Sequence, residues 1–480
     1  SHREGRFVYH VASFVMPQGM ISYDYKITNG EETLYYNKLG WVESRDPYYA
    51  FRVTGGFKTP DWAKGAVIYQ IFVDRFCNGD KSNDVVNDEY YYINGNSIQI
   101  QNWDETPKVF DVRCFYGGDL AGVRSKLDYL QSLGVEVIYF NPLFVSPSNH
   151  KYDSQDYNHI DPHYGVIVND NNDILREGEC DNSRAGKYIT RTTDVENLEA
   201  SDKYFTDLVE EIHRRGMRVI LDGVFNHCGS FNRWLDREGI YENQKGYSKG
   251  AYVSSRSPYR NYFSFKEADW PYNDTYDGWW GHETLPKLNY EDSPELYADI
   301  LRIAAKWVSP PYNCDGWRLD VAADLGHTPE FNHRFWKDFR NTVKKANPDA
   351  IILAEHYGDP SAWLRGDEWD TVMNYDAFME PITWFLTGLE KHSDEYNAGL
   401  LGNGDWFFKN ITHNMSKFQQ GSLCVAMNEL SNHDHSRFMT RTNHKIGRAK
   451  DLGCNAASED INPAVFMAAT VLLMTWPGAP

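Results

Sequence analysis

Short apolar runs alternate with amphipathic helical stretches from Gly65 onward, and this alternation most narrows the folds open to the chain. Short apolar runs bounded by turn signals are typical of buried strands. A repeated strand–helix order predicts a parallel sheet with crossover helices. Seven strands are predicted, at residues 66–72, 135–140, 218–222, 316–320, 350–355, 371–374 and 423–427.

Helices are predicted between these strands from apolar spacing and from end signals. The apolar residues from Leu120 to Leu130 share one helical face, and Gly134 follows as a C-terminal signal. Ser293 and Pro294 begin another helix, as N-cap and first-turn proline. Further helices are predicted at 205–212, 329–346 and 463–475.

The pattern predicts an α/β fold, a (β/α)8 barrel truncated before its last strand. Seven strands fit an eightfold barrel that lacks one strand, and Trp476 to Pro480 has the composition of a turn leading into a further strand. A barrel without one strand would have two open edges. We therefore expect this chain to be a fragment of a longer protein.

Residues 1–57 differ from the rest because apolar and polar residues alternate along them. This predicts an N-terminal all-β module, which looks incomplete. The barrel would then occupy 58–480. Two connections, 141–200 and about 226–290, are too long for plain loops, and the second predicts a small inserted subdomain.

Composition excludes some partners. The chain has 48 Lys+Arg against 68 Asp+Glu, a net charge of −20, which argues against nucleic acid or an anionic membrane. No apolar run reaches transmembrane length. Aromatic residues make up 15%, which suits either stacking on sugar rings or an aromatic-rich core. The seven scattered cysteines predict reduced thiols and favour a cytoplasmic location, while an extracellular one stays open because the chain begins at Ser1.

Arg318 and Asp320 lie two residues apart at the end of a predicted strand. Because side chains alternate between faces of a strand, these two should point the same way. A neighbouring cation lowers the pKa of a carboxyl group, which would keep Asp320 ionised and suit it to act as a nucleophile. The alternative is a structural ion pair.

Polar residues follow four of the predicted strands. They are Asp222 to His227, Arg318 with Asp320, Glu355 with His356, and Asn432 to Asp434. Each cluster alone has an ordinary explanation, such as a loop cap at Asp222. A barrel enzyme collects its active-site groups at the carboxyl ends of its strands, so four clusters in order predict one site.

These residues permit glycosidic cleavage, which needs a nucleophilic carboxylate and a second carboxyl that gives and then takes a proton. Asp320 fits the first role and Glu355 the second. Asp434 would bind sugar hydroxyls and distort the ring. His227 and His433 would donate hydrogen bonds that strengthen as positive charge develops on the sugar.

Four segments resemble the signature regions of the α-amylase superfamily, glycoside hydrolase family 13. They are LDGVFNH (221–227), GWRLD (316–320), LAEH (353–356) and NHD (432–434). The resemblance implies a (β/α)8 TIM barrel and a retaining hydrolase of α-glucosidic bonds in starch-type glucans, pullulan or cyclodextrins. It implies that Asp320 is the nucleophile, Glu355 the acid/base and Asp434 the third carboxylate.

The same resemblance implies substrate-binding roles for further residues. Arg318, His227 and His433 match substrate- and charge-orienting positions. Tyr152 resembles the aromatic platform beneath the sugar to be cleaved, and His150 and Asp153 flank it. A core tyrosine is the alternative for Tyr152.

Leu285 to Asn289 resembles a region typical of the neopullulanase, cyclomaltodextrinase and maltogenic amylase group. That group carries an N-terminal β-sandwich, which suits residues 1–57 as a partial module and makes a homodimer possible. Ala323 and Asp324 depart from the group's pattern on the acceptor side. An α-glucanotransferase or an amylopullulanase using the same site is therefore an alternative, and a non-catalytic carbohydrate-binding homologue is a weaker one because all three acids are present.

A cluster of oxygen donors between residues 78 and 119 predicts a calcium site, because calcium prefers hard oxygen ligands. An Asx-rich turn is the alternative. The spacing resembles the calcium loop of the neopullulanase group. The ligands it implies are Asn78, Asp80, Asn83, Asp84, the carbonyl of Gly117, and Asp119.

Overall fold

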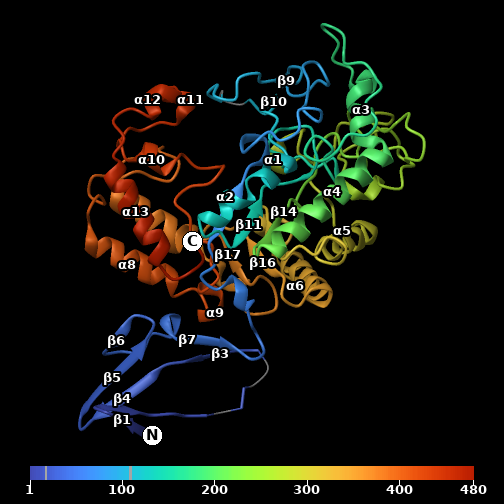
Figure 1. Cartoon of the computed structure of the whole chain (residues 1–480). Helices are drawn as coiled ribbons and strands as arrows, with labels where there is room; N and C mark the ends of the chain where they lie inside the picture. Colours follow the sequence, from blue (N-terminus) through green and yellow to red (C-terminus); the bar gives the residue numbers. More distant parts are fainter. Residues whose placement is uncertain (14, 17–18, 108–110) are drawn as a thin grey trace.

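A computed structural model describes residues 1–13, 15–16, 19–107 and 111–480, without the side chains of Ala449, Lys450 and Cys454. Figure 1 shows a strand-rich N-terminal region below a larger body of parallel strands and surrounding helices. In the part described, no helix is long and apolar enough to cross a membrane. Cysteines 77, 180, 228, 314 and 424 are free thiols, in agreement with the prediction from their scatter.

Six parallel strands form the central sheet, in the order β17-β16-β15-β14-β11-β8. The prediction of a parallel sheet is confirmed, and each of the first six predicted strands lies where the apolar runs placed it, although most are shorter. The strands are β8 (Ile68–Ile71), β11 (Val137–Phe140), β14 (Arg218–Gly223), β15 (Gly316–Leu319), β16 (Ile351–Ala354) and β17 (Thr371–Val372).

The seventh and eighth positions of the ring are formed by isolated bridges. Met427 makes parallel bridges with Met373 and Ala479, and the Ile68 amide donates to the Pro480 carbonyl at 2.7 Å. The predicted strand at 423–427 is wrong for most of its length, because helix α9 (Gln420–Leu423) ends at its first residue and Cys424 and Val425 form a turn before Met427. Backbone hydrogen bonds through Met427, Ala479 and Pro480 thus span the two edges that were expected to be open.

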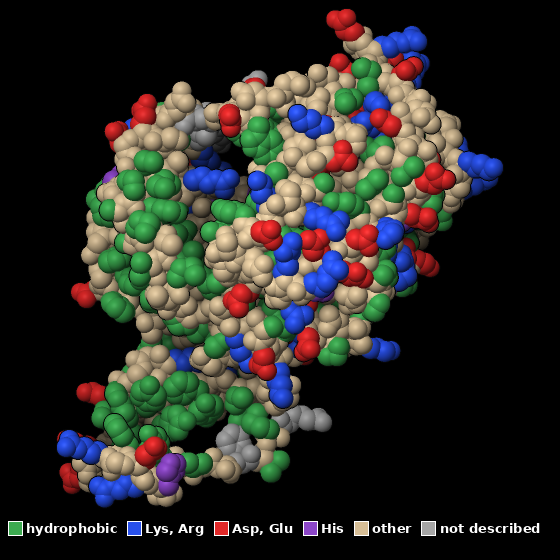
Figure 2. Space-filling model, in the orientation of Figure 1, with side chains coloured by type: hydrophobic (Ala, Val, Ile, Leu, Met, Phe, Trp, Pro, Cys, Tyr) green, Lys and Arg blue, Asp and Glu red, His purple; other side chains and the backbone are tan. Residues whose placement is uncertain are grey.

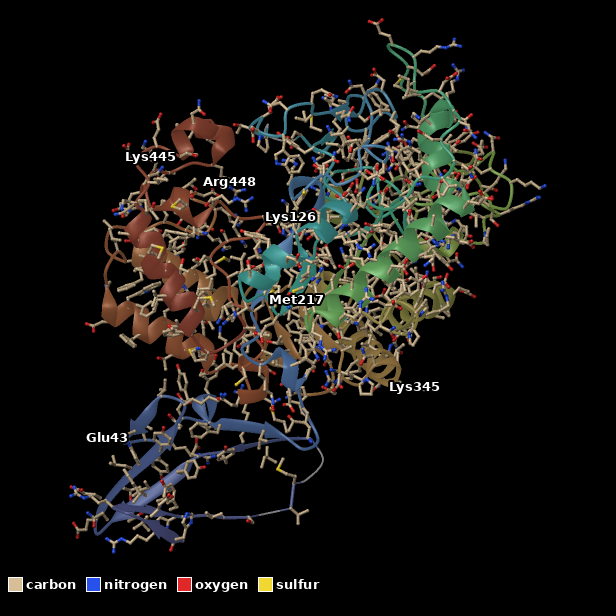
Figure 3. All side chains as sticks on the ribbon, in the orientation of Figure 1. Glu43, Lys126, Met217, Lys345, Lys445 and Arg448 are labelled. Carbon is tan, nitrogen blue, oxygen red and sulfur yellow. The ribbon has the colours of Figure 1, made fainter. Side chains whose placement is uncertain are left out.

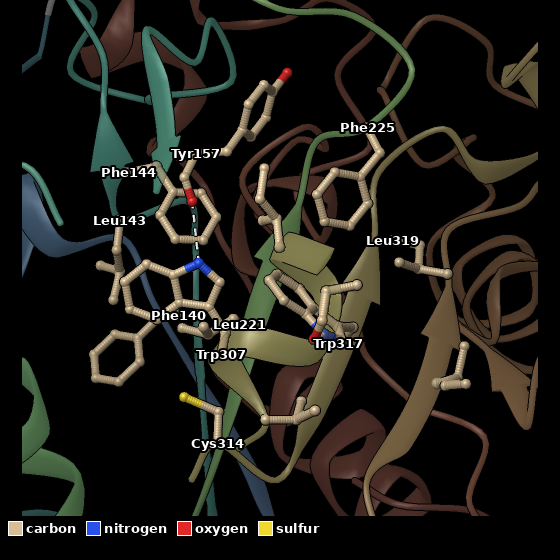
Figure 4. Close-up of a cluster of buried hydrophobic side chains, with 14 of the residues drawn as sticks. Phe140, Leu143, Phe144, Tyr157, Leu221, Phe225, Trp307, Cys314, Trp317 and Leu319 are labelled. Carbon is tan, nitrogen blue, oxygen red and sulfur yellow. Dashed lines mark hydrogen bonds between the residues drawn. The ribbon is translucent and has the colours of Figure 1, made fainter. Parts of the chain in front are cut away.

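Alternation along the strands separates two apolar layers. Val137, Tyr139, Ile220 and Leu353 belong to a cluster with Met427 inside the ring. The residues that alternate with them face the helices and join the largest cluster, where five fully buried tryptophans pack. Figure 4 shows part of this layer, including the hydrogen bond from the Trp307 indole to the Tyr157 carbonyl. The high aromatic content therefore serves the core in large part.

Helices cover the outside of the sheet. The helix predicted at 120–130 is divided at Lys126, whereas those at 329–346 and 463–475 are confirmed to the residue. Ser293 caps α5 as expected, accepting from the Leu296 amide. The helices are α1 (Leu120–Ser125), α2 (Leu127–Ser132), α3 (Gly186–Thr193), α4 (Val195–Arg214), α5 (Pro294–Trp307), α6 (Pro329–Ala346), α7 (Glu380–Thr387), α8 (Gly404–Met415), α10 (Phe438–Arg441), α11 (Ala449–Leu452), α12 (Cys454–Ala457) and α13 (Pro463–Thr475).

The two long connections carry little regular structure. The first contains the antiparallel pair β12 (Phe144–Val145) and β13 (Asp156–Ile160), and α3. A short parallel pair, β9 (Ile98–Gln99) and β10 (Cys114–Phe115), lies before it. The second, 226–290, is irregular, and its Trp234 and Tyr262 pack into the main core. The proposed domain boundaries, including the inserted subdomain, stay a prediction.

The N-terminal region consists of short antiparallel strands with an exposed apolar face. Figure 2 shows hydrophobic side chains gathered on it, and Figure 3 labels Glu43 there and Lys345 on the outer end of α6. The strands are β1 (His2–Glu4), β2 (Phe7–Tyr9), β3 (Met20–Tyr23), β4 (Tyr25–Asn29), β5 (Glu32–Asn37), β6 (Gly40–Val42) and β7 (Phe51–Thr54).

Candidate active site

Arg318 lies at the centre of an acidic cluster at the carboxyl end of the sheet. Its Nη1 donates to Asp320 Oδ1 at 2.8 Å and to Asp222 Oδ1 at 3.0 Å. Its Nη2 forms an ion pair with Glu355 Oε2 at 3.0 Å. All four side chains are at most 10% exposed. The strand alternation that placed Arg318 and Asp320 on one face is confirmed, and the fold adds two acids to the pair.

The expected lowering of the Asp320 pKa is wrong in direction. Burial raises this pKa well above its usual value, and Arg318 opposes the shift while Glu355 and Asp222 add to it. The physical reason is that one guanidinium is shared among three buried carboxyl groups. The cluster therefore has more acids than one cation can hold ionised, and it retains a proton more readily than an isolated Arg–Asp pair.

Two tyrosine hydroxyls hold Asp222 in place. Tyr139 Oη and Tyr152 Oη donate to Asp222 Oδ2 at 2.6 and 2.7 Å. Tyr152 stacks on His433 with ring centroids 5.0 Å apart and an angle of 8°. The Arg318 guanidinium lies 5.8 Å from the centre of the Tyr152 ring. Tyr152 is thus a partly exposed ring beside the acids, as expected of an aromatic platform.

Both predicted histidines are neutral and oriented by hydrogen bonds. Burial lowers the pKa of His227 and of His433 to about 4. Gln70 Nε2 donates to His433 Nδ1 at 2.9 Å, which leaves the His433 Nε2–H for other partners. His227 Nε2 instead donates to the Tyr152 carbonyl at 3.1 Å. The expectation that His227 donates to sugar therefore does not fit, because its proton is already used to hold the loop that carries Tyr152.

His150 and Asp153 have different surroundings. His150 Nδ1 accepts from the Tyr152 amide at 3.1 Å, and its ring lies beside that of Tyr152. Asp153 is fully buried and accepts from Ser148 Oγ at 2.5 Å. The expected sugar contact of Asp153 does not agree with this burial, whereas a role in holding the loop does.

Asp434 lies at the rim of the site, outside the Arg318 cluster. Its side chain is 49% exposed, and Oδ2 lies 3.4 Å from His433 Nε2. Asn432 Oδ1 accepts from the Asp434 amide at 2.9 Å. Cavities of about 530 and 290 Å³ meet at His433, the second of them lined by Asp434. A half-exposed acid beside such space suits contact with ligand hydroxyls.

Asp324, in the pair that departs from the related group, fixes an aromatic side chain. Asp324 Oδ2 accepts from Trp279 Nε1 at 2.9 Å, and its carbonyl accepts from Lys287 Nζ at 2.7 Å. Trp279 stacks on His227, with centroids 4.9 Å apart. Lys287 also donates to Asn226 Oδ1 at 3.1 Å.

The predicted calcium ligands lie together. Asp84 accepts from Asn78 Nδ2 at 2.7 Å, and a Cβ added to Gly117 would lie 2.4 Å from Asp84. The Oδ1 atoms of Asn78 and Asn83 are buried without a hydrogen-bond donor, which suits a cation. Two acids fit less well, because Asp80 accepts from Ser82 and Asp119 caps α1. Among the described residues no group of three His, Cys, Asp or Glu side chains could hold a metal, so amide and backbone oxygens would be needed.

Several site residues were not found from the sequence. Gln70 and Tyr139 project from strands that were predicted from their apolar residues alone. Glu429 and Tyr375 lie beside Glu355, within regions predicted only as strand ends. The one available signal was position, since each of these polar groups lies within or just after a predicted barrel strand.

Comparison with known proteins identifies one family over most of the chain. The family described as "Alpha amylase, catalytic domain" matches residues 70–177 and 186–464. A cyclomaltodextrinase of Thermoanaerobacter pseudethanolicus is 31% identical over 94% of this chain and 66% of that relative. Neopullulanase 2 of Thermoactinomyces vulgaris is 33% identical over 99% of the chain and 66% of the relative.

Solved structures agree with these relatives. A type III pullulan hydrolase from Thermococcus kodakarensis superposes with a TM-score of 0.67 at 28% identity, covering 95% of this chain and 68% of the other.

An amylopullulanase of Thermoanaerobacter thermohydrosulfuricus is 32% identical, but this chain spans only 30% of its length. The chain thus spans about two thirds or less of the curated relatives it matches.

Proposed function

Because the chain belongs to the α-amylase family, we propose that it carries the catalytic domain of a retaining glycoside hydrolase acting on α-glucosidic bonds. The observation that carries this proposal is the convergence of Asp222, Asp320 and Glu355 on Arg318. Double displacement at a sugar carbon needs two carboxyl groups of different role, and Arg318 holds Asp320 and Glu355 together at the site.

Asp320 and Glu355 act in both steps of the proposed reaction. The Asp320 carboxylate attacks the anomeric carbon while the Glu355 carboxyl gives its proton to the glycosidic oxygen, so that the bond to the leaving sugar breaks. Water then attacks the glycosyl–enzyme, Glu355 takes the proton from water, and Asp320 leaves as a carboxylate. Tyr152 would lie beneath the sugar, and the His433 Nε2–H and Asp434 would bind its hydroxyls.

The substrates proposed are starch-type glucans, pullulan or cyclodextrins. Relatives named cyclomaltodextrinase, neopullulanase and pullulan hydrolase support this choice. Amylopullulanase among the relatives supports the alternative that α-1,6 bonds are cleaved at the same site. Asp324, which fixes Trp279 beside the site, is where a preference for hydrolysis or for transfer to a second sugar would be set.

The hydrolase proposal is tested with β-cyclodextrin, pullulan and starch. Asp320→Asn should lower kcat by about 10⁴-fold or more while binding of the glucan is kept, because the nucleophile is lost without loss of volume. Reducing-sugar release measures turnover, and calorimetry measures binding. An unreactive wild-type protein, or an Asp320→Asn variant with wild-type turnover, contradicts the proposal.

Calcium is proposed at the cluster around Asn78, Asn83, Asp84 and the Gly117 carbonyl, with Asp119 at its edge. A bound cation would satisfy the two unpartnered amide oxygens and stabilise the folded state. Chelation should lower the melting temperature, calcium should restore it, and Asp84→Asn should lose this response. A melting temperature that changes with neither the chelator nor calcium argues against the site.

Two further proposals concern the whole protein. A homodimer through the N-terminal region is supported by its exposed aromatic side chains, among them Tyr25 and Trp41. Sedimentation measures the oligomeric state, and a monomer at all concentrations refutes the dimer. The cytoplasm is the proposed compartment, supported by a Bacillus subtilis relative named intracellular maltogenic amylase.

A further inference from the structure

Glu429 is a buried carboxyl group beside the site for which the proposed reaction has no use. It follows Met427 and Asn428, which hold the seventh position of the ring through bonds to Ala479. The residue is 7% exposed. A carboxyl group is rarely buried without a partner, so its place needs a physical reason.

Its hydrogen-bond partner is Asn432. Asn432 Nδ2 donates to Glu429 Oε1 at 2.9 Å and to Tyr375 Oη at 3.1 Å. Asn432 Oδ1 accepts from the Asp434 amide. The amide nitrogen of Asn432 thus donates twice and its oxygen accepts once, although the residue is only 3% exposed. These bonds join Glu429 to Tyr375 and to the Asp434 backbone.

Tyr375 continues the connection to Glu355. Its hydroxyl accepts from Asn432, and its own proton can be donated to Glu355 Oε1 at 3.4 Å or to Met373 Sδ at 3.3 Å. The other oxygen, Glu355 Oε2, accepts from the Val321 amide at 3.0 Å and pairs with Arg318. The orientation of the Glu355 carboxyl thus depends on Tyr375 on one side and on Val321 and Arg318 on the other.

We propose that Glu429 is a positioning residue of this site, which fixes Asn432 and, through it, the Tyr375 hydroxyl against Glu355 and the backbone of Asp434. This inference rests on the function proposed above. It assigns Glu429 no contact with substrate.

The charge state of Glu429 agrees with this role. Burial raises its pKa to about 8, so the carboxyl is mostly neutral at neutral pH and adds no further negative charge beside the Arg318 cluster. A neutral carboxyl keeps its carbonyl oxygen as the acceptor that Asn432 needs. The titratable groups that act on Glu429 or on which it acts are Arg318, Glu355, Asp434, Tyr357, Tyr375 and Arg441.

Two substitutions distinguish the role of Glu429 as a hydrogen-bond acceptor from its role as an ionisable acid. Glu429→Gln keeps a carbonyl oxygen for Asn432 and carries no charge, whereas Glu429→Leu removes the acceptor. With a soluble α-glucan at pH 7, we expect Glu429→Gln to keep kcat within about twofold of wild type. Glu429→Leu should lower kcat by about tenfold, with KM changed less than about twofold, because a lost hydrogen bond misplaces the acid/base and not the substrate.

The matched control is Glu368→Leu. Glu368 is also a buried acid, 2% exposed, but it lies before the start of β17. Its partner is His333 on α6. It should change stability and leave kcat unaltered. If Glu429→Leu does not fold, Glu429→Met removes the carbonyl acceptor with an unbranched side chain of similar length. A double variant with Tyr375→Phe should lose little more kcat than Glu429→Leu alone, since both act on one path.

A measurement that does not depend on catalysis tests the role of Glu429 separately from the proposed function. Hydrogen–deuterium exchange of residues 428–437 should be faster in Glu429→Leu and unchanged in Glu429→Gln. If the wild type cleaves no glucan, the proposed function fails and exchange still decides the role of Glu429. The inference is overturned by unchanged exchange and kcat in Glu429→Leu, by a loss in KM alone, or by a Glu429→Gln variant as impaired as Glu429→Leu.

Discussion

At the scale of single residues, Arg318 shows how tertiary context changes the meaning of a motif. As an isolated pair with Asp320, it would lower the pKa of the acid. In the fold, Asp222 and Glu355 compete for the same guanidinium, and burial raises the pKa of Asp320 and of Asp222. Val321, directly after Asp320, has a φ of 38°, a strained value for a β-branched residue, and its amide holds Glu355.

Asp236 offers a residue-scale prediction away from the site. It is fully buried, Oδ1 accepts from the Tyr241 amide at 3.0 Å, and Oδ2 has no partner. Burial raises its pKa to about 7 from 3.8. Between those values the folded state binds more protons than the unfolded state, so this residue lowers stability as pH rises from about 4 to 7.

Asp236→Asn should remove that loss. The asparagine keeps the bond from Tyr241 and tolerates the φ of 54° at this position. Its free energy of unfolding should exceed that of wild type by about 2–4 kcal/mol at pH 8 and equal it near pH 3.5. Urea unfolding at several pH values measures the difference, and a gain that does not change with pH contradicts the explanation.

At the scale of elements, the loop that carries Tyr152 is held by a buried charge network. Lys151 Nζ lies 2.6 Å from Asp161 Oδ2, and both side chains are at most 1% exposed. His163 connects Asp161 to Glu89, and Glu89 pairs with Arg191 on α3. Lys151 and its neighbours hold the pKa of Asp161 far below its usual value. The aromatic platform thus depends on ion pairs outside the site.

Lys151→Met should therefore destabilise the protein by about 3–5 kcal/mol, since Asp161 would lose its closest cation in a buried place. Turnover should also fall, because Tyr152 follows directly. Urea unfolding and glucan hydrolysis measure the two effects. The control is Lys203→Met, whose partner Asp207 is exposed, and which should change stability by less than about 1 kcal/mol. Equal effects of the two substitutions would show that the network does not support the loop.

At the scale of the whole molecule, the N-terminal region is joined to the barrel by few polar contacts. Lys38 Nζ donates to the carbonyls of Ser416 and Phe418 at 2.6 and 2.7 Å, just after α8. Tyr49 Oη lies 2.9 Å from His413 Nδ1 on α8. Thr59, between the two regions, is buried, and its Oγ1 donates to the Gly421 carbonyl. This junction is anchored to α8 and α9.

Lys38→Met should loosen the junction. Burial lowers the pKa of Lys38 to about 8, so the folded state binds fewer protons than the unfolded state between pH 8 and 10.5, and wild-type stability gains from this residue as pH rises there. The variant should lack that gain and be cut faster by protease near residues 55–62. Lys26→Met, on the exposed strand β4, is the control. Cleavage at the wild-type rate in both variants argues against the anchoring role of Lys38.

The sequence by itself determined the local elements and the chemistry they carry. Apolar period, caps and prolines placed six parallel strands and the helices α5, α6 and α13, because these signals act within a few residues. Four polar clusters after strands predicted one site, since parallel strands end on one side of a sheet. The prediction of the seventh strand was wrong because α9 and the turn after it carry the chain to Met427, where only an isolated bridge forms.

Only the tertiary structure decided how charges and protons are distributed. Which acids share Arg318, why Asp153 is buried, and where the His227 proton goes depend on residues far apart in the chain. Glu429 shows the same limit, because its link to Glu355 passes through Asn432 and Tyr375 on two different segments. Electrostatic and hydrogen-bond effects depend on distance and burial in space, and spacing along the chain does not encode either.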